Sequence, residues 1–297
     1  IRFSSLDKYD METNQQEMNS KFKGEDVVNF VTVVHDFLAE TSRLYDAYNN
    51  EPATKSIAAQ ERINFPSRGS VENVHYGGIL SMEAAADHLM VFADSLKAPA
   101  KTIAPWTCVR GLLESCALAS WFLDPTIDVR TRVSRYFAFR YIGFIQQIKL
   151  YNVDGNRQED VKRVEERIQK VEQDAINLGY PRVLNKKSHE IEGIGQKMPG
   201  ITELIGLTLN RESNYRLLSA IAHGHHWATH QIGFRITDFT DSKGVAQKGL
   251  EKHVEPVFVL YAGNIAVTSF AQVLWYIWRL YGWNEQEIKA LLDTTFD

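Results

Sequence analysis

Cysteine is scarce in this sequence, which has only two, Cys108 and Cys116, among 297 residues. They stand eight residues apart in a stretch predicted to be one helix, which separates them by about 12 Å along the axis. A disulfide between them is therefore excluded, and neither has an adjacent base that would favour a thiol nucleophile. We expect both to be core residues of a protein in a reducing, cytoplasmic compartment, since the polar N-terminus also lacks a secretory leader.

Several motifs of common enzyme classes are also absent. The chain contains no Gly-rich phosphate loop, no Gly-x-Ser-x-Gly nucleophile elbow, no internal repeat and no alternation of strands with helices. Its 33 Lys and Arg residues against 37 Asp and Glu residues give a net charge of -4. A surface that is basic all round is thus excluded, so that any contact with nucleic acid has to be local.

Long runs without charge are rare, and only one is long enough to cross a membrane. Val257–Trp278 has 22 residues with no charged side chain, which suffices for a membrane span. Polar residues interrupt it, and no second run of this kind accompanies it. We therefore expect a helix buried on all sides at the centre of a bundle, and no membrane partner.

Apolar residues recur at helical spacing through most of the chain, which indicates an all-α fold. The predicted helices cover 25–48, 54–62, 79–96, 103–123, 127–151, 158–178, 201–209, 215–231, 256–281 and 285–292. An alternating segment predicts a small β-hairpin or a loop near 234–250, whereas the rest of 51–78 and 181–200 are expected to be connections. Six to eight of these helices are expected to form a bundle, which is a single domain at 25–297 behind a flexible lead at 1–24.

The stretch from Asn214 to Trp227 concentrates the reactive groups of the chain. Four of the nine histidines stand between 223 and 230, and Arg216 precedes them by two helical turns. On a helix, Arg216 and His223 are seven residues apart, so their side chains project within roughly 20° of each other. A permanent cation and a titratable imidazole can therefore converge on one small anion.

Such a pair fits the cleavage of RNA without a metal. This reaction needs a base for the 2′-hydroxyl proton, an acid for the leaving oxygen and a cation for the charged phosphorane. Histidine suits the proton transfers near neutral pH, and arginine binds phosphate in bidentate geometry. One helix supplies only one residue of each type, so two copies in a symmetric dimer would complete the site.

The spacing of Arg216 and His223 resembles the Arg-x4–6-His motif of the HEPN superfamily of helical nucleotide-binding proteins and RNases. Upstream, Arg110–Glu114 and then Asp124-Pro125 before an arginine-rich helix are similar to an uncharacterised bacterial branch of such bundles. The resemblance implies a homodimer with a composite cleft for RNA or a nucleotide. It also implies a toxin, defence or stress system, with a protein partner such as an antitoxin.

The motif departs from its commonest form at one position. A polar residue usually follows the arginine, where this chain has Leu217. Relatives without the full motif are expected to bind rather than to cut. A non-catalytic helical scaffold that binds a nucleotide or a partner is therefore the alternative to a metal-independent endoribonuclease.

In this reading Arg216 holds the scissile phosphate and His223 acts as general acid or base, while neighbouring residues and a basic helix interleaved with aromatic residues contact the substrate. The residues expected to bind substrate are Ser219, His226, Asn214, Arg135 and Arg140. Arg110 and Glu114 lie four residues apart in one helix and are expected to form an ion pair that supports the site from behind. For the helix that carries Arg135 and Arg140 a second interpretation stays open, with its aromatic residues in the core and its arginines on a solvated face.

The histidine cluster also permits a metal site. His226 and His230 lie one helical turn apart, a spacing that can chelate Zn, Ni or Fe. His88, in the predicted helix 79–96, is the candidate third ligand. A metal-dependent helical-bundle enzyme is therefore a second alternative, whereas the leading interpretation has no metal and no cofactor.

Overall fold

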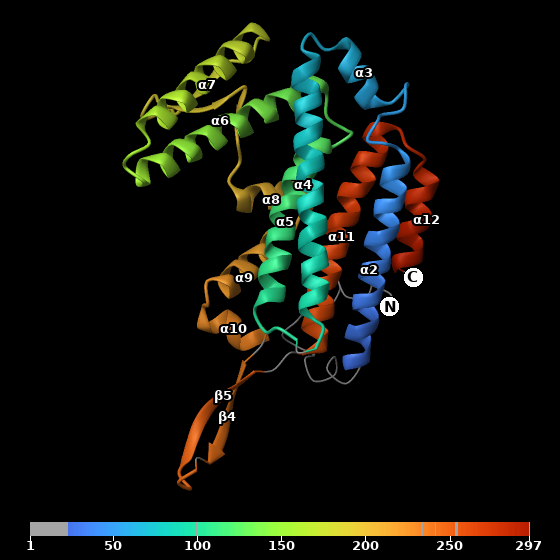
Figure 1. Ribbon diagram of the computed structural model, residues 1–297, viewed down its shortest axis with the longest axis vertical. Helices are drawn as coiled ribbons and strands as arrows, with labels where there is room; N and C mark the ends of the chain where they lie inside the picture. Colours follow the sequence, from blue (N-terminus) through green and yellow to red (C-terminus); the bar gives the residue numbers. More distant parts are fainter. Residues whose placement is uncertain (1–22, 99, 233, 241, 253–254, 297) are drawn as a thin grey trace.

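The computed structural model describes residues 23–98, 100–232, 234–240, 242–252 and 255–296. The lead predicted at 1–24 lies outside them except for its last two residues. Eleven helices and five short strands make up the described part of the chain, so the predicted all-α bundle is confirmed (Figure 1). Seven of these helices have twelve or more residues, and four shorter ones bring the total above the expected six to eight.

The core of the bundle surrounds α11 (Pro256–Tyr281), the helix predicted to lie at its centre. Around it pack α2 (Gly24–Ala47), α3 (Ile57–Asn64), α4 (Arg68–Ser95), α5 (Ala104–Leu123) and α12 (Glu285–Phe296). Aromatic contacts join these helices; Phe37 of α2, for example, meets Phe270 of α11 edge to face with ring centroids 6.0 Å apart. By length and composition α11 could span a membrane, and 78% of its most apolar stretch is buried inside the protein.

A second, smaller hydrophobic cluster lies between α6 (Val129–Val153) and α7 (Gln158–Asn177). A three-stranded antiparallel sheet completes it, formed by β1 (Arg182–Leu184), β2 (Ile191–Ile194) and β3 (Gln196–Lys197). The prediction of a connection at 181–200 was therefore wrong. Strands of two to four residues are too short to show an alternating pattern.

Three short helices follow the sheet: α8 (Ile201–Leu209), α9 (Glu212–Ala222) and α10 (His226–Ile232). α8 and α9 pack against α5, below α6 in the view of Figure 1. Gly224 follows the cap residue His223 and adopts the left-handed conformation with a φ of 69°, which ends α9 at Ala222. The single helix predicted through 215–231 is therefore two helices.

The β-hairpin predicted near 234–250 is confirmed. Its strands β4 (Phe234–Thr240) and β5 (Ala246–Lys252) pair antiparallel from Phe234–Lys252 to Thr240–Ala246. In Figure 1 the hairpin extends well beyond the end of the helical bundle. Exposed apolar side chains on β4, those of Ile236 and Phe239, are consistent with this position outside the core.

α4 begins eleven residues before the predicted helix 79–96, and Gly77 and Gly78 lie inside it. Gly78 faces α5, where a Cβ atom built on it would stand 2.5 Å from Cγ of Leu123. Glycine at this position therefore allows α4 and α5 to approach closely, instead of making the turn expected from a Gly pair.

Gly78→Ala should reduce the free energy of unfolding by about 1–3 kcal/mol, because the added methyl group overlaps Leu123 in a packed core. Gly69→Ala is the matched control, since the same helix has open space around that residue. Alanine there should leave stability unchanged or raise it by about 1 kcal/mol or less. Urea unfolding of both variants checks this, and equal stabilities would contradict the packing argument.

Candidate functional site

The predicted catalytic pair lies on the solvent side of α9. This helix anchors itself through Tyr215, Leu218 and Ile221, which are buried against the bundle. Arg216 and His223 are exposed, and the side chain of Arg216 keeps 67% of its surface accessible. A helix held firmly on one side thus presents both residues to a ligand on the other.

Arg216 is engaged by a carboxylate of its own helix. Its Nε and Nη2 atoms donate to Oε1 of Glu212 at 2.9 and 2.8 Å. The two side chains line a shallow pocket of about 410 Å³ against α8, beside Gly206 and Leu207. An exposed ion pair one turn apart contributes only about 0.3–0.5 kcal/mol, so a phosphate group can displace Glu212 at little cost.

His223 stands at the C-terminal cap of α9, where its backbone N–H donates to the carbonyl of Ser219. Its ring lies 6.4 Å from that of His225, and both residues are exposed. The backbone N–H of His225 donates to the carbonyl of Ala220 at 2.9 Å, which caps the C-terminal end of α9. The imidazole of His223 is therefore placed by a defined backbone turn and is open to solvent.

The three predicted substrate-binding residues near α9 fall in different surroundings. Asn214 donates from Nδ2 to the hydroxyl of Tyr261 at 2.9 Å and so ties α9 to α11. Ser219 is half-buried on α9, between Arg216 and His223 in sequence. His226 is exposed at the start of α10. Of the three, His226 is the most accessible to a ligand.

The arginines of α6 contact neighbouring parts of the protein. Arg135 donates from Nη1 to the carbonyl of Trp121 at 2.6 Å and stacks over its ring at 5.5 Å. Arg140 stacks on Tyr136 and Phe144, with distances of 5.6 and 5.1 Å to the ring centroids. α6 lies above α9, with α8 between them in Figure 1. The structure does not bring these two arginines together with Arg216 and His223.

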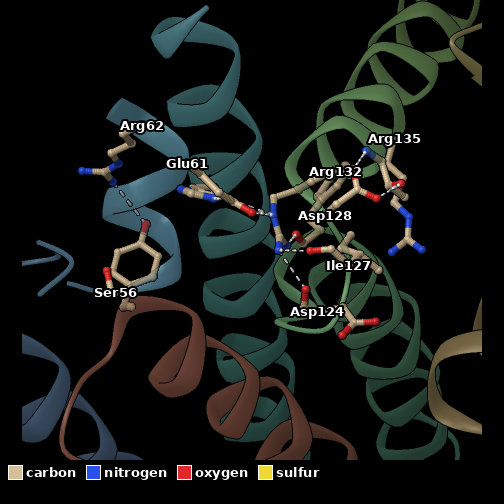
Figure 2. Close-up of polar contacts among 12 residues, drawn as sticks. Ser56, Glu61, Arg62, Asp124, Ile127, Asp128, Arg132 and Arg135 are labelled. Carbon is tan, nitrogen blue, oxygen red and sulfur yellow. Dashed lines mark hydrogen bonds and ion pairs between the residues drawn. The ribbon is translucent and has the colours of Figure 1, made fainter. Parts of the chain in front are cut away.

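Arg132 of the same helix is wholly buried and is the centre of a polar network. Its Nε contacts both carboxylate oxygens of Glu61 at 3.1 and 3.2 Å, and Figure 2 shows Glu61 reaching toward it from α3. Its other nitrogens donate to the backbone carbonyls of Phe122, Asp124 and Ile127, which belong to the end of α5 and the turn before α6. The network therefore joins α3, α5 and α6.

His75 of α4 completes this network. Its Nε2 lies 2.9 Å from Oε2 of Glu61, and burial, opposed by the hydrogen bond to Glu61, lowers the pKa of its imidazole. The neutral ring therefore donates from Nε2 to the carboxylate. Each helix contributes one member to this buried cluster. Nδ1 of His75 has no hydrogen-bond partner among the described residues, and the ion pair and hydrogen bonds of the other members are suited to a structural role rather than to binding a ligand.

The free energy of unfolding should fall as pH decreases below about 6.5, the pKa of histidine in an unfolded chain. Because the pKa of His75 is lowered in the folded protein, the unfolded state binds a proton that the native state does not. Through His75 alone, the free energy of unfolding can fall by up to about 1.4 kcal/mol per pH unit. Urea unfolding of the wild type and of His75→Gln at several pH values checks it, and equal pH slopes would refute the assignment.

A second polar cluster, formed by Arg110, Glu114 and Tyr215, lies at the surface between α5 and α9. Nε of Arg110 is 3.1 Å from Oε1 of Glu114, which confirms the predicted ion pair. The hydroxyl of Tyr215 donates to the same oxygen at 2.9 Å and accepts from Nη2 of Arg110 at 3.4 Å. The side chains of Arg110 and Glu114 are 28% and 36% exposed, so the ion pair is only partly buried.

This cluster lines a pocket of about 590 Å³, a volume typical of small-molecule sites. Sequence reasoning missed the pocket, although Tyr215 stands directly before Arg216. The available signal was that tyrosine, a residue that needs a hydrogen-bond partner when buried. Nothing in the sequence places it beside Glu114, because that contact depends on how α9 packs on α5.

The metal alternative gains no support from the arrangement of the histidines. The rings of His226 and His230 lie 6.2 Å apart on α10, whereas His88 packs from α4 against Gly111 of α5. Within the described ranges, no three His, Cys, Asp or Glu side chains gather as a metal site would require. Cys108 and Cys116 are free, as their spacing predicts.

No protein-family model, curated protein or solved structure matches this chain.

Proposed function

We propose that the protein is a HEPN-like, RNA-directed protein that cleaves RNA without a metal, at a site shared by two copies of the chain. The observation that carries the proposal is the exposure of Arg216 and His223 on one helix whose opposite side is anchored in the bundle. A pair buried and fully satisfied within one subunit would have favoured a structural role. The resemblance of this pair to the Arg-x4–6-His motif adds the reaction class.

The proposed reaction is an attack of the 2′-hydroxyl oxygen on the adjacent phosphorus. The O2′–P bond forms, the P–O5′ bond breaks, and the products are a 2′,3′-cyclic phosphate and a 5′-hydroxyl. One His223 accepts the 2′-hydroxyl proton, and the partner's His223 protonates the leaving 5′ oxygen. Arg216 leaves Glu212 and stabilises the charge on the phosphorane oxygens.

Exposed apolar side chains near the catalytic pair support a dimer. Leu207 of α8 is 69% exposed and lines the same pocket as Arg216. Trp227 of α10, which directly follows His225 and His226 in the sequence, is 58% exposed. Large apolar residues on either side of a polar site are typical of a protein interface. We propose that they contact the second copy, in a cytoplasmic toxin, defence or stress system with a protein partner.

The test is cleavage of a single-stranded RNA by purified protein in the presence of EDTA, with analysis of the product ends. We expect 2′,3′-cyclic phosphate ends and a rate per chain that rises with protein concentration as the dimer forms. Sedimentation over the same range of concentrations measures the dimer directly. Intact RNA at concentrations where the protein is dimeric would overturn the proposal.

A second candidate function is binding of RNA or a nucleotide without cleavage. The ion pair between Arg216 and Glu212 favours it, since the arginine pairs with a residue one turn toward the start of α9, whereas His223 follows the end of that helix. Leu217 stands where a polar residue is usual in the motif, which also points to binding. RNA retained in a filter-binding assay, with no cleavage products, would establish this second function.

A further inference from the structure

The pocket between α4, α5, α8 and α9 has apolar walls and one polar end. Its walls include Leu80 of α4, Leu118 of α5, Phe139 of α6 and Met198 before α8. The ring of Phe139 is held edge to face against Phe122, with centroids 5.4 Å apart. Packed helices therefore hold the walls, so the pocket exists before any ligand enters.

The polar end presents hydrogen-bonding groups that the protein leaves unused. Oε1 of Glu114 accepts a hydrogen bond from Tyr215 and lies 3.1 Å from Nε of Arg110 in the ion pair, whereas Oε2 has no hydrogen-bond partner among the described residues. Nη1 of Arg110 likewise has none there, so the polar end offers one unused acceptor and one unused donor. Burial raises the pKa of Tyr215, which stays protonated and keeps Glu114 in place.

The charges at this end cancel. Arg110 and Glu114 are the only charged side chains among the described residues that line the pocket. An anion would meet Glu114 and a cation would meet Arg110, so neither is favoured by net charge. A neutral group with a donor and an acceptor side by side satisfies both residues.

We propose that this pocket binds a nucleobase with a lactam edge, guanine in particular, whose ring N–H donates to Glu114 and whose carbonyl oxygen accepts from Arg110. The inference rests on the proposed function, because the base would belong to the RNA that Arg216 and His223 act on. Sequence-specific proteins commonly insert an unstacked RNA base into such a pocket and bind its polar edge. The apolar side chains Phe139 and Met198 cover the ring faces.

The position of the pocket agrees with this role. Ile201 of α8 lines both this pocket and the pocket that contains Arg216. Tyr215 at the polar end is the direct neighbour of Arg216 on α9. A base held here therefore lies close to the residue that holds the phosphate, and the pocket selects the nucleotide next to the cleaved bond.

Isothermal titration with inosine and adenosine tests the proposal, because the two nucleosides differ only at the edge that the pocket reads. Inosine carries the N–H and the carbonyl of guanine, whereas adenosine has an amino group and a bare ring nitrogen there. We expect inosine and guanosine to bind at least about tenfold more tightly than adenosine, as for a site built to recognise polar groups. Equal binding of inosine and adenosine, or no binding up to their solubility limits, would overturn the inference.

Two variants and a control distinguish loss of binding in the pocket from a general effect on folding. Glu114→Gln should weaken inosine binding roughly tenfold, since a hydrogen bond to a charged group is lost. Ala84→Phe fills the pocket from the exposed side of α4 and should abolish binding without removing any polar contact. Glu83→Gln, beside it on α4, is the control and should bind as the wild type does. Normal binding by Ala84→Phe would place the ligand elsewhere.

The titration tests the base pocket and the RNA cleavage assay tests the nuclease function, so either proposal can be refuted without the other. Wild-type protein that binds inosine selectively but leaves RNA intact would refute the proposed nuclease function and retain the base pocket. Protein that cleaves RNA with the same products beside every base, and does not bind inosine, would retain the nuclease and refute the pocket. Each of these results identifies which of the two proposals is wrong.

Discussion

Arg132→Met should lower the free energy of unfolding by about 3–5 kcal/mol, the usual cost of removing one partner of a buried ion pair. The loss has a physical cause: the buried carboxylate of Glu61 is left without its cationic partner, and among the described side chains His75 still hydrogen-bonds to it. The backbone carbonyls of Phe122, Asp124 and Ile127 lose their donor at the same time. A typical domain has about 5–15 kcal/mol of stability in total, so this variant should be close to unfolding at physiological temperature.

Urea unfolding, followed by circular dichroism, measures this effect. Arg163→Met is the matched control, because Arg163 lies on the exposed face of α7 with 70% of its side chain accessible. It should change stability by about 0.5 kcal/mol or less. Glu61→Gln combined with Arg132→Met should cost less than the sum of the two single changes, since the uncompensated charge is gone. Equal stabilities of Arg132→Met and Arg163→Met would show that the network contributes little.

Arg216→Ala and His223→Ala should each reduce the rate of RNA cleavage by roughly 10²–10⁴-fold. Loss of a positioned acid or base accounts for an effect of this size at His223. Loss of a cation that stabilises transition-state charge accounts for it at Arg216. Both residues are exposed, so the two substitutions should leave the free energy of unfolding within about 0.5 kcal/mol of the wild type.

A cleavage time course on fluorescent RNA, with unfolding curves for each variant, checks both parts of this prediction. Arg43→Ala is the control for Arg216, because Arg43 is an exposed helix residue that pairs with Glu40 in the same manner. His35→Ala, on α2, is the control for the loss of an imidazole away from α9. Parent-like cleavage by Arg216→Ala or His223→Ala would remove these residues from the mechanism.

Local signals predict the helices well where they agree with the packing. α8 occupies its predicted bounds, 201–209, because Gly200 and Asn210 flank an uninterrupted apolar run. The same signals mislead at Gly77-Gly78, which lies inside α4, and Gly78 marks a close contact with α5 and not a turn. A glycine required by a neighbour distant in sequence cannot be distinguished from a turn glycine by its local context.

The same limit applies to the candidate site. The ion pair of Arg110 and Glu114 could be predicted, because their spacing places them on one face of a helix. Their contact with Tyr215 spans about a hundred residues and depends on the docking of α9 against α5. The burial of Arg132 was equally hidden, since its place in an arginine-rich helix indicates a solvated face. Contacts that follow from spacing within one helix can be predicted from the sequence. Contacts between helices depend on how the helices pack.

The central place of α11 has a consequence for synthesis of the protein. A chain leaves the ribosome from its N-terminus, and α2, α4 and α5 are complete long before α11 is made. Until then the sides of these helices that will pack on α11, including Phe37, have no core to cover them. The nascent chain therefore exposes apolar surface through most of its translation, and it is a natural client for chaperones that bind near the ribosome.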